Sequence, residues 1–174
     1  MKTSLGSIKE LRKITSASIS DCQKAIQDSG GDIQRAVELL RKRGLEIAAK
    51  KQDRVAKQGR IEAYVHLGNK IGVLLEVDCE TDFVAQNSDF AQFTKDVAMQ
   101  IAASSPLYIS KEEVPQNIIK EANDQEQFYK ENCLLEQVFI KDPNITIKDY
   151  LGSLVVKIGE NVVIRRFIRY KVGE

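Results

Sequence analysis

Long apolar segments are absent from this chain of 174 residues. No apolar run approaches the ~20 residues that a membrane-spanning helix requires. The N-terminal segment MKTSLGSIKELRK has neither the apolar stretch nor the small-residue cleavage site of a secretory signal. From these two absences we expect no secretory leader and no membrane partner.

Cysteine and histidine are both scarce. The three cysteines, Cys22, Cys79 and Cys133, are an odd number, lie far apart and form no CxxC pair. Free thiols in a reducing compartment are the favoured interpretation. The single histidine, His66, has no cysteine or histidine companion at metal-ligand spacing. The sequence therefore predicts no metal site and no cofactor.

Sequence motifs of nucleotide binding and catalysis are missing too. There is no GxxxxGK(S/T) loop, no GxGxxG, no GxSxG and no cysteine–histidine nucleophile pattern. The acidic residues Asp78, Glu80 and Asp82 could hold a cation or form an ordinary solvated loop. They lack the glycine and the twelfth-position glutamate of an EF-hand. These absences predict that the chain is not an enzyme.

Charge is unevenly distributed along a chain whose formal net charge is only +1. Residues 1–60 hold 14 lysines and arginines against 7 acids, a net of +7, whereas residues 61–174 carry a net of −6. A basic part followed by an acidic part is typical of proteins that bind nucleic acid, or a protein partner with its own charge pattern. With 43% hydrophobic residues, the composition is that of an ordinary globular protein.

Residues 1–44 have the pattern of three short helices. Capping boxes at Ser7–Glu10 and Ser20–Gln23 open the first two, and Asp32 caps a third helix that ends at Gly44. The side chains expected to face inward are Ile8, Leu11, Ile14, Cys22, Ala25, Ile26, Ile33, Ala36, Val37 and Leu40. So small a core is marginal alone, which favours a docking module that leans on a neighbour.

Residues 45–60 form a charged connector that we expect to be helical in its first half. Its basic residues are Lys50, Lys51, Arg54, Lys57 and Arg60. They form either a solvated face or a phosphate-binding strip. No aromatic residue is interleaved with them, which argues against stacking on single-stranded nucleic acid.

Residues 61–174 are predicted to fold as an α+β core, a small antiparallel sheet packed by helices. A period of two and a turn at Gly68-Asn69 predict a hairpin over Ile61–Cys79. The segment ENVVIRRFIRYKV is expected to be a last strand that joins this hairpin. Further expected elements are a helix from Asn87 or Ser88 with Phe90, Phe93, Val97 and Ile101 inward, helical structure over 111–132, a turn at Asp142–Asn144, and a helix over Thr146–Gly159.

The junction that follows the hairpin, LLEVDCETDFVAQNSDF, places a large aromatic residue beside a carboxylate. Phe83 could pack on Val84 and the next helix, with Asp82 as a cap or first-turn acid. Alternatively, the pair could enter a partner, because a strand–helix junction at the rim of a sheet is exposed. The sequence pattern leaves both interpretations open.

The segment EVDCETDFVA, Glu76 to Ala85, resembles the core signature of the translation elongation factor Ts family. The segments KELRKIT, DCQKAI and GDIQRAVELLRKRG resemble that family's N-terminal module, which has a three-helix ubiquitin-associated-like fold. RIEAYVHLGNKIGVLLEV resembles its hairpin, DVAMQIAA its core helix, and LLEQVFIKD and IGENVVIRRFIRY its C-terminal part. Together these segments cover most of the chain, in order.

The resemblance implies a guanine-nucleotide exchange factor that binds elongation factor Tu with GDP bound. Thr81, Asp82, Phe83 and Val84 would enter this partner, with Asp82 and Phe83 as a wedge that dislocates Mg²⁺ and perturbs the phosphate site. The N-terminal module would dock on the nucleotide-binding domain, and its candidate residues are Leu11, Arg12, Asp21 and Cys22. The resemblance further implies a homodimer, no direct contact with nucleic acid, and the cytoplasm of a bacterium or the stroma of a plastid as the compartment.

Three departures from the family pattern accompany this resemblance. The family's glycine-rich loop before Asp21 is replaced by residues 15–20, TSASIS, and Asp78 stands where an asparagine is usual. A helical stretch common in relatives is missing between Tyr129 and Cys133. Two other functions are compatible with the sequence: a nucleic-acid-binding module on the basic third, and an adaptor for ubiquitin-like surfaces. The apolar-Gly-aromatic loop that such adaptors present is not found at Ser16–Ser20.

Overall fold

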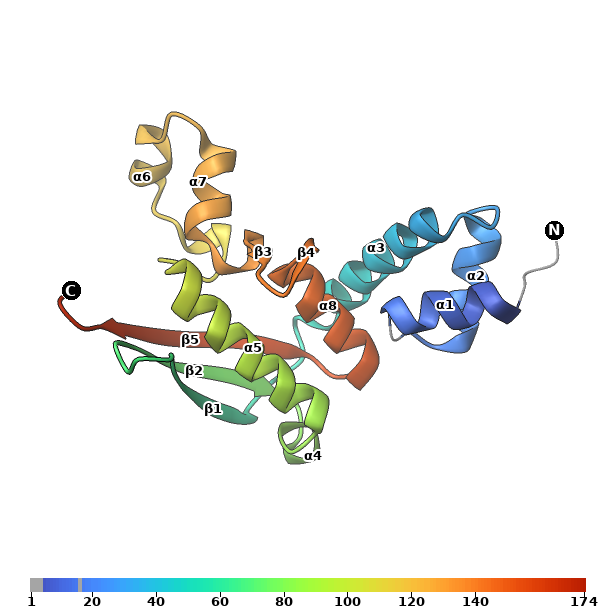
Figure 1. Cartoon of the computed structure of the whole chain (residues 1–174), viewed down its shortest axis with the longest axis horizontal. Coiled ribbons are helices and arrows are strands. Elements are labelled where there is room, and N and C mark those ends of the chain that lie inside the picture. The colour runs from blue at the N-terminus through green and yellow to red at the C-terminus, as the bar shows by residue number, and fades with distance from the viewer. Residues whose placement is uncertain (1–4, 16) are drawn as a thin grey trace.

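The computed structural model describes residues 5–15 and 17–174, which form two connected parts (Figure 1). The N-terminal part consists of the helices α1 (Leu5–Thr15), α2 (Ile19–Asp28) and α3 (Ile33–Lys51). The first half of α3 packs on α1 and α2, and its second half lies against the α+β core. α3 therefore joins the two parts as one continuous element.

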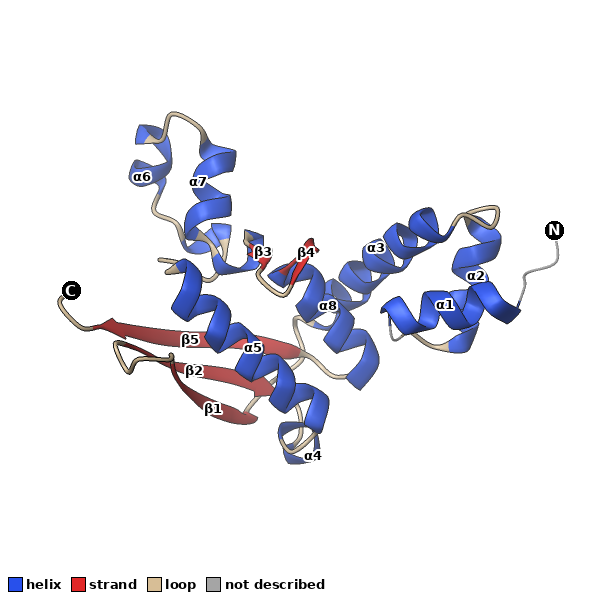
Figure 2. Cartoon of the chain, viewed as in Figure 1, coloured by secondary structure: helices blue, strands red, loops and turns tan. Residues whose placement is uncertain are grey.

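The core contains a three-stranded sheet with helices packed against it (Figure 2). Its elements are β1 (Gln58–Val65), β2 (Ile71–Cys79), α4 (Asp82–Ala85), α5 (Ser88–Ser104), α6 (Gln116–Glu121), α7 (Gln125–Asn132), β3 (Val138–Phe139), β4 (Asp142–Thr146), α8 (Ile147–Ile158) and β5 (Val162–Lys171). This confirms the predicted α+β class. Over residues 5–15 and 17–174, every helix is too short or too polar to cross a membrane.

The helix caps of the N-terminal part differ from two of the three predicted. The cap of α2 is Ser18, whose hydroxyl accepts a hydrogen bond of 3.1 Å from the amide of Asp21. Ser20 lies inside this helix and Ser7 lies inside α1, so neither residue is the helix cap that the sequence predicted. Asp32 caps α3 as predicted. A cap requires an extended residue just before the helix, and Ser18 has that conformation.

The small core of the N-terminal part contains nine of the ten side chains predicted to face inward. Ile14 is the exception, because its side chain is 58% exposed. Thr15, four residues after Leu11, is half-buried instead, and its hydroxyl donates to the Leu11 carbonyl at 2.8 Å. A helical face can advance by three or four residues, and here packing selects four.

The sequence predicted that the third helix ends at Gly44. In the structure this helix continues to Lys51. Gly44 is buried where α3 crosses α8 beside Gly152. A Cβ atom added at Gly152 would lie 3.2 Å from Leu45 Cδ2 and 3.5 Å from the Gly44 carbonyl carbon. The two glycines thus permit close approach of two helix backbones, and Gly44 is not a C-terminal cap. The predicted helical first half of the connector is confirmed.

The sheet has the order β1-β2-β5, with both pairs antiparallel. The hairpin turn uses positive φ at both Gly68 and Asn69, and the C-terminal strand pairs with β2 as predicted. On β1 the polar residues face α5, since Glu62 accepts a hydrogen bond from Thr94 at 3.3 Å. Ile61 and Val65 are instead 67% and 63% exposed on the opposite face.

α5 crosses the inner face of the sheet and supplies much of the core (Figure 1). Phe90, Phe93, Val97 and Ile101 are fully buried, as their helical spacing predicted. α8 begins at a capping box between Thr146 and Asp149, and Gly159 closes it with φ 82°.

The last corrections concern the segments between α5 and α8. The turn predicted at Asp142–Asn144 lies earlier, at Ile140-Lys141, because residues from Asp142 onward pair with β3. The helical structure predicted over 111–132 is confirmed, as a 3-10 turn at Lys111–Glu113 followed by the short helices α6 and α7. They stand apart from the sheet around a satellite core that includes Ile119 and Cys133.

Candidate functional site

The junction between β2 and α5 carries an exposed aromatic side chain on the one-turn helix α4. Thr81 is the cap of α4, Asp82 is in its first turn, and the side chain of Phe83 is 83% exposed. Phe83 therefore does not fold back onto its own core. Val84 and Ala85 do, because both pack against the main hydrophobic cluster. α4 thus has an inner face that anchors it and an outer face formed by Asp82 and Phe83.

An exposed phenylalanine needs a physical reason. Leaving a large aromatic side chain in water forgoes roughly 1.5–3 kcal/mol of burial free energy. The inner residues Phe90 and Phe93, a few positions along the chain, are fully buried. Exposed aromatic side chains on a supported element are typical of surfaces that bind another macromolecule.

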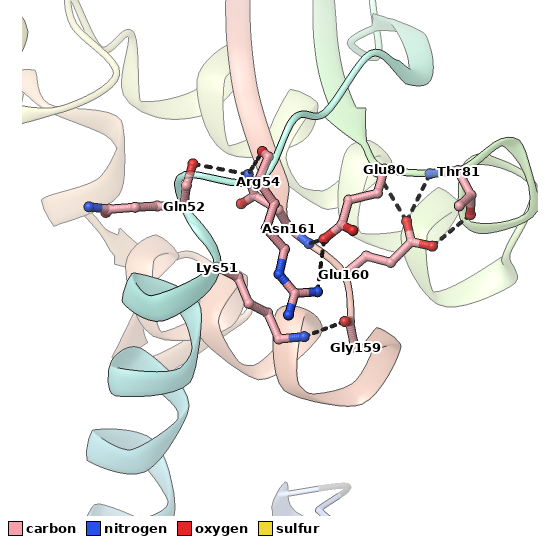
Figure 3. Close-up of polar contacts among 8 residues, drawn as sticks. All are labelled: Lys51, Gln52, Arg54, Glu80, Thr81, Gly159, Glu160 and Asn161. Atoms are coloured by element: carbon pink, nitrogen blue, oxygen red, sulfur yellow. Dashed lines mark hydrogen bonds and ion pairs between the residues drawn. The ribbon is translucent and has the colours of Figure 1, made fainter.

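The backbone of Thr81 is held from several directions. The carboxylate of Glu160 accepts hydrogen bonds from the amides of Glu80 and Thr81, both at 3.0 Å, and from the Thr81 hydroxyl at 2.6 Å (Figure 3). The thiol of Cys79 donates to the Thr81 carbonyl at 3.1 Å. Burial, followed by the charge of Glu160, raises the pKa of this thiol to about 11, so it keeps its proton at neutral pH.

Glu160 was not among the candidate residues that the sequence supplied. It follows Gly159 at the end of α8, about eighty residues from the junction that it contacts. The IGENVVIRR segment has the pattern of a strand, and no local signal ties its single acid, Glu160, to the Thr81 region. Only the pairing of β5 with β2 brings the two segments together.

The four candidates of the N-terminal module separate into two kinds. Leu11 and Cys22 are fully buried in the module's own core, so their side chains support its fold. Arg12 is exposed, and Asp21 is half-buried in an ion pair of 3.1 Å with Arg43. Direct contact with a partner is therefore open to Arg12 and Asp21. Of the loop that replaces the family's glycines, Ser16 lies outside the described residues.

The acidic cluster at the end of β2 does not converge on a common point. Asp78 pairs with Arg165 at 2.7 Å, and Glu80 pairs with Arg54 at 3.5 Å. Asp82 is exposed on α4. Within the part of the chain that the structure describes, no group of three histidine, cysteine or acidic residues could hold a metal ion. Asp78 and Glu80 are therefore engaged in separate ion pairs within the fold, and only Asp82 is exposed to solvent.

The basic connector is largely engaged by the core. Lys51 donates to the carbonyl of Gly159, and Arg54 pairs with Glu80 (Figure 3). Arg60 pairs with Glu62 at 3.0 Å. Three of its five basic side chains thus have acidic or carbonyl partners. This arrangement does not favour a strip that binds nucleic-acid phosphates.

The candidate site is thus an exposed tip, formed by Asp82 and Phe83 on α4 of an α+β core, and such tips are typical of proteins that bind another macromolecule. A family model described as Elongation factor TS matches residues 4–126 and 124–174. Elongation factor Ts of Thermoanaerobacter sp. (strain X514) is 46% identical, with 96% of this chain and 93% of the relative covered. For that of Caldanaerobacter subterraneus subsp. tengcongensis the values are 47%, 96% and 95%. The chain belongs to the elongation factor Ts family, the nucleotide exchange factors of translation elongation.

The same comparisons bear on the shortened region. The alignments extend over 190 positions, more than the 174 residues of this chain, so the relatives contain residues with no counterpart here. The family model matches in two segments that meet at residues 124–126, at the start of α7. The extra residues of the relatives support the prediction that a stretch common in the family is missing from this chain.

Proposed function

We propose that this protein binds elongation factor Tu in its GDP form and promotes GDP release by inserting Asp82 and Phe83 into it. The observation that carries this proposal is the 83% exposure of Phe83 on a helix whose other face is anchored in the core. Insertion would displace Mg²⁺ and perturb the phosphate site of the partner. The Mg²⁺ matters because it neutralises phosphate charge that the protein must otherwise hold.

Such an exchange factor needs no catalytic group of its own. It binds the nucleotide-free partner more tightly than the GDP-bound partner, and the difference is a coupling free energy. The coupling is reciprocal, because GDP must weaken the factor's binding as much as the factor weakens GDP's. Binding of GTP then displaces the factor and completes the cycle. We further propose that Arg12 and Asp21 contribute to docking of the N-terminal module.

We also propose that two copies of this chain associate through the outer face of the sheet. Paired positions Ala63, Leu74 and Ile168 form an apolar row across this face. Leu74 is 49% and Ile168 is 44% exposed. A shallow, mainly apolar depression at this row is lined by Ile61, Leu74, Leu75, Glu76, Arg166, Phe167 and Ile168.

The charges beside the apolar row favour a second copy as the occupant. Glu76 and Arg166 are neighbours across β2 and β5, joined at 2.5 Å. A two-fold axis through the face would place each charge of one copy near the opposite charge of the other. Isologous interfaces are self-complementary in this way. We place the dimer in the compartment of translation, the cytoplasm of a bacterium or the stroma of a plastid.

Release of a fluorescent GDP analogue from elongation factor Tu tests the exchange proposal. We expect the parent protein to accelerate release, and Asp82→Ala combined with Phe83→Ala to lose at least tenfold of that acceleration, because both inserting side chains are removed. Leu107→Ala is the matched control, since Leu107 is also an exposed apolar residue, 66% exposed, away from the tip. Equal acceleration by parent and double variant would refute the wedge, and no acceleration by the parent would refute the function.

A further inference from the structure

The turn that follows α8 crosses over to the junction that carries the tip. Glu160 uses both carboxylate oxygens there (Figure 3). Oε2 accepts from the amides of Glu80 and Thr81, and Oε1 accepts from the Thr81 hydroxyl. Hydrogen bonds to an ionised acceptor are about twice as strong as those between neutral groups. The carboxylate therefore fixes the last residues before α4.

The opposite contact is present as well. The carboxylate of Glu80 accepts from the amide of Asn161 at 2.6 Å, so each segment offers an acid to the other's backbone. We call the four residues Glu80, Thr81, Glu160 and Asn161 the clasp. The Asn161 side chain donates in turn to the carbonyls of Gln52 and Arg54, at 3.2 and 2.8 Å. The Asn161 side chain thus connects the clasp to the backbone that follows α3.

The tip has little else to orient it. α4 has only four residues, and a helix so short is not stable by its own hydrogen bonds. Its cap is weak, because the amide of Val84 lies 3.4 Å from the Thr81 hydroxyl. Phe83 gains no orientation from packing, as it is 83% exposed. The direction of Phe83 therefore depends on Val84 and Ala85, which pack inward, and on Thr81, which the clasp and the Cys79 thiol hold.

We propose that Glu160 is a positioning residue for the wedge, acting through Thr81; this inference rests on the proposed exchange function. The carboxylate is specifically suited to this role, since it offers acceptors to three donors at once. A glutamine at this position would keep one oxygen and turn an N–H group toward another donor. The wedge would then become ordered only on contact with the partner. Because this ordering costs free energy during binding, productive insertion would be slower.

The first test is Glu160→Gln in the GDP-release assay, with the concentration of the factor varied. We expect the maximal release rate to fall about tenfold, because misplacement of about 1 Å can cost up to a hundredfold. The control is Asp149→Asn at the other end of α8. Asp149 likewise accepts from a threonine amide and hydroxyl, those of Thr146, both at 2.9 Å. This control should lower the melting temperature comparably and leave the maximal rate within twofold.

A double-variant cycle with Phe83→Leu separates positioning from general stability. If Glu160 acts through the wedge, Glu160→Gln should lower the rate less in the Phe83→Leu background than in the parent. Its effect on the melting temperature should be equal in both backgrounds. An equal loss of rate in both backgrounds, or an unchanged maximal rate in folded Glu160→Gln, overturns the proposal. Should Glu160→Gln fail to fold, Thr81→Val breaks the same bond from the other side and replaces it in the cycle.

A separate measurement keeps this inference distinct from the exchange function. Hydrogen exchange of the peptide covering residues 80–87 should accelerate at least fivefold in Glu160→Gln and not in Asp149→Asn, because only the former releases these amides. If hydrogen exchange is faster in Glu160→Gln but the parent protein does not accelerate GDP release from elongation factor Tu, the exchange function is wrong and the positioning role stands. If protection is unchanged in Glu160→Gln, the positioning is wrong whatever the exchange assay gives.

Discussion

Phe83 and Phe93 are the same residue type, ten positions apart, and the protein uses them in opposite ways. Phe93 is fully buried on α5, with its ring centroid 5.0 Å from that of Tyr150. Phe83 is 83% exposed on α4. The first contributes burial free energy to the fold, whereas the second leaves its apolar surface in water, where the proposed function has it enter a partner. If that proposal is correct, substitutions on α5 should change stability and substitutions on α4 should change binding.

The largest expected effect is that of Phe93→Ala. Truncation of a buried phenylalanine leaves a cavity and costs about 3–5 kcal/mol of unfolding free energy. Chemical denaturation monitored by circular dichroism measures this loss directly. A loss below about 1 kcal/mol would contradict the assignment of Phe93 to the core. The GDP-release activity should fall only in proportion to the fraction of unfolded protein.

The two faces of the sheet extend the comparison to assembly. Leu75 is fully buried on the inner face, whereas its neighbour Leu74 is 49% exposed on the outer one. Leu74→Glu places a charge in the proposed dimer interface, so we expect a monomer at concentrations where the parent is a dimer. Sedimentation velocity measures the change. Leu107→Glu, at an exposed site elsewhere, is the control, and a parent protein that is monomeric would remove the proposal.

The buried thiol of Cys79, at the end of β2, should make the stability of the protein depend on pH. Its pKa is raised from 9.0 to about 11, first by burial and then by Glu160, so the folded protein holds this proton more tightly than the unfolded chain does. The resulting stability is fully present below about pH 9 and is lost as the pH rises toward 11. Denaturation at several pH values should show this decline, and Cys79→Ala should make it shallower. An unaltered slope in the variant would assign the decline to other groups.

Phe83→Ala is expected to have the smallest effect on stability. Because the side chain is exposed, its removal should change the free energy of unfolding by no more than about 0.5 kcal/mol. The same denaturation experiment used for Phe93→Ala gives the comparison. A loss of more than about 2 kcal/mol of unfolding free energy would mean that Phe83 packs in the fold and is not available to a partner.

Local patterns predicted much of this architecture. The hairpin turn at Gly68-Asn69, the helix of Phe90 and Phe93, and the capped helix from Thr146 follow from residues close in sequence. The TDFV tip was located by its resemblance to a family, on residues 81–84. Predictions went wrong where a residue type has two structural uses. Gly44 was interpreted as a helix end and instead allows two helices to approach.

The sequence by itself determined the kinds of elements, most of their inward faces and the family, because periodicity, turn residues and motifs are local properties. Tertiary structure alone decided that Phe83 faces solvent, which face of β1 meets α5, and that Glu160 holds Thr81. These depend on contacts between separate segments, such as the pairing of β2 with β5 that brings Glu160 beside Thr81. An acid eighty residues away carries no local signal until the strands that flank it are paired.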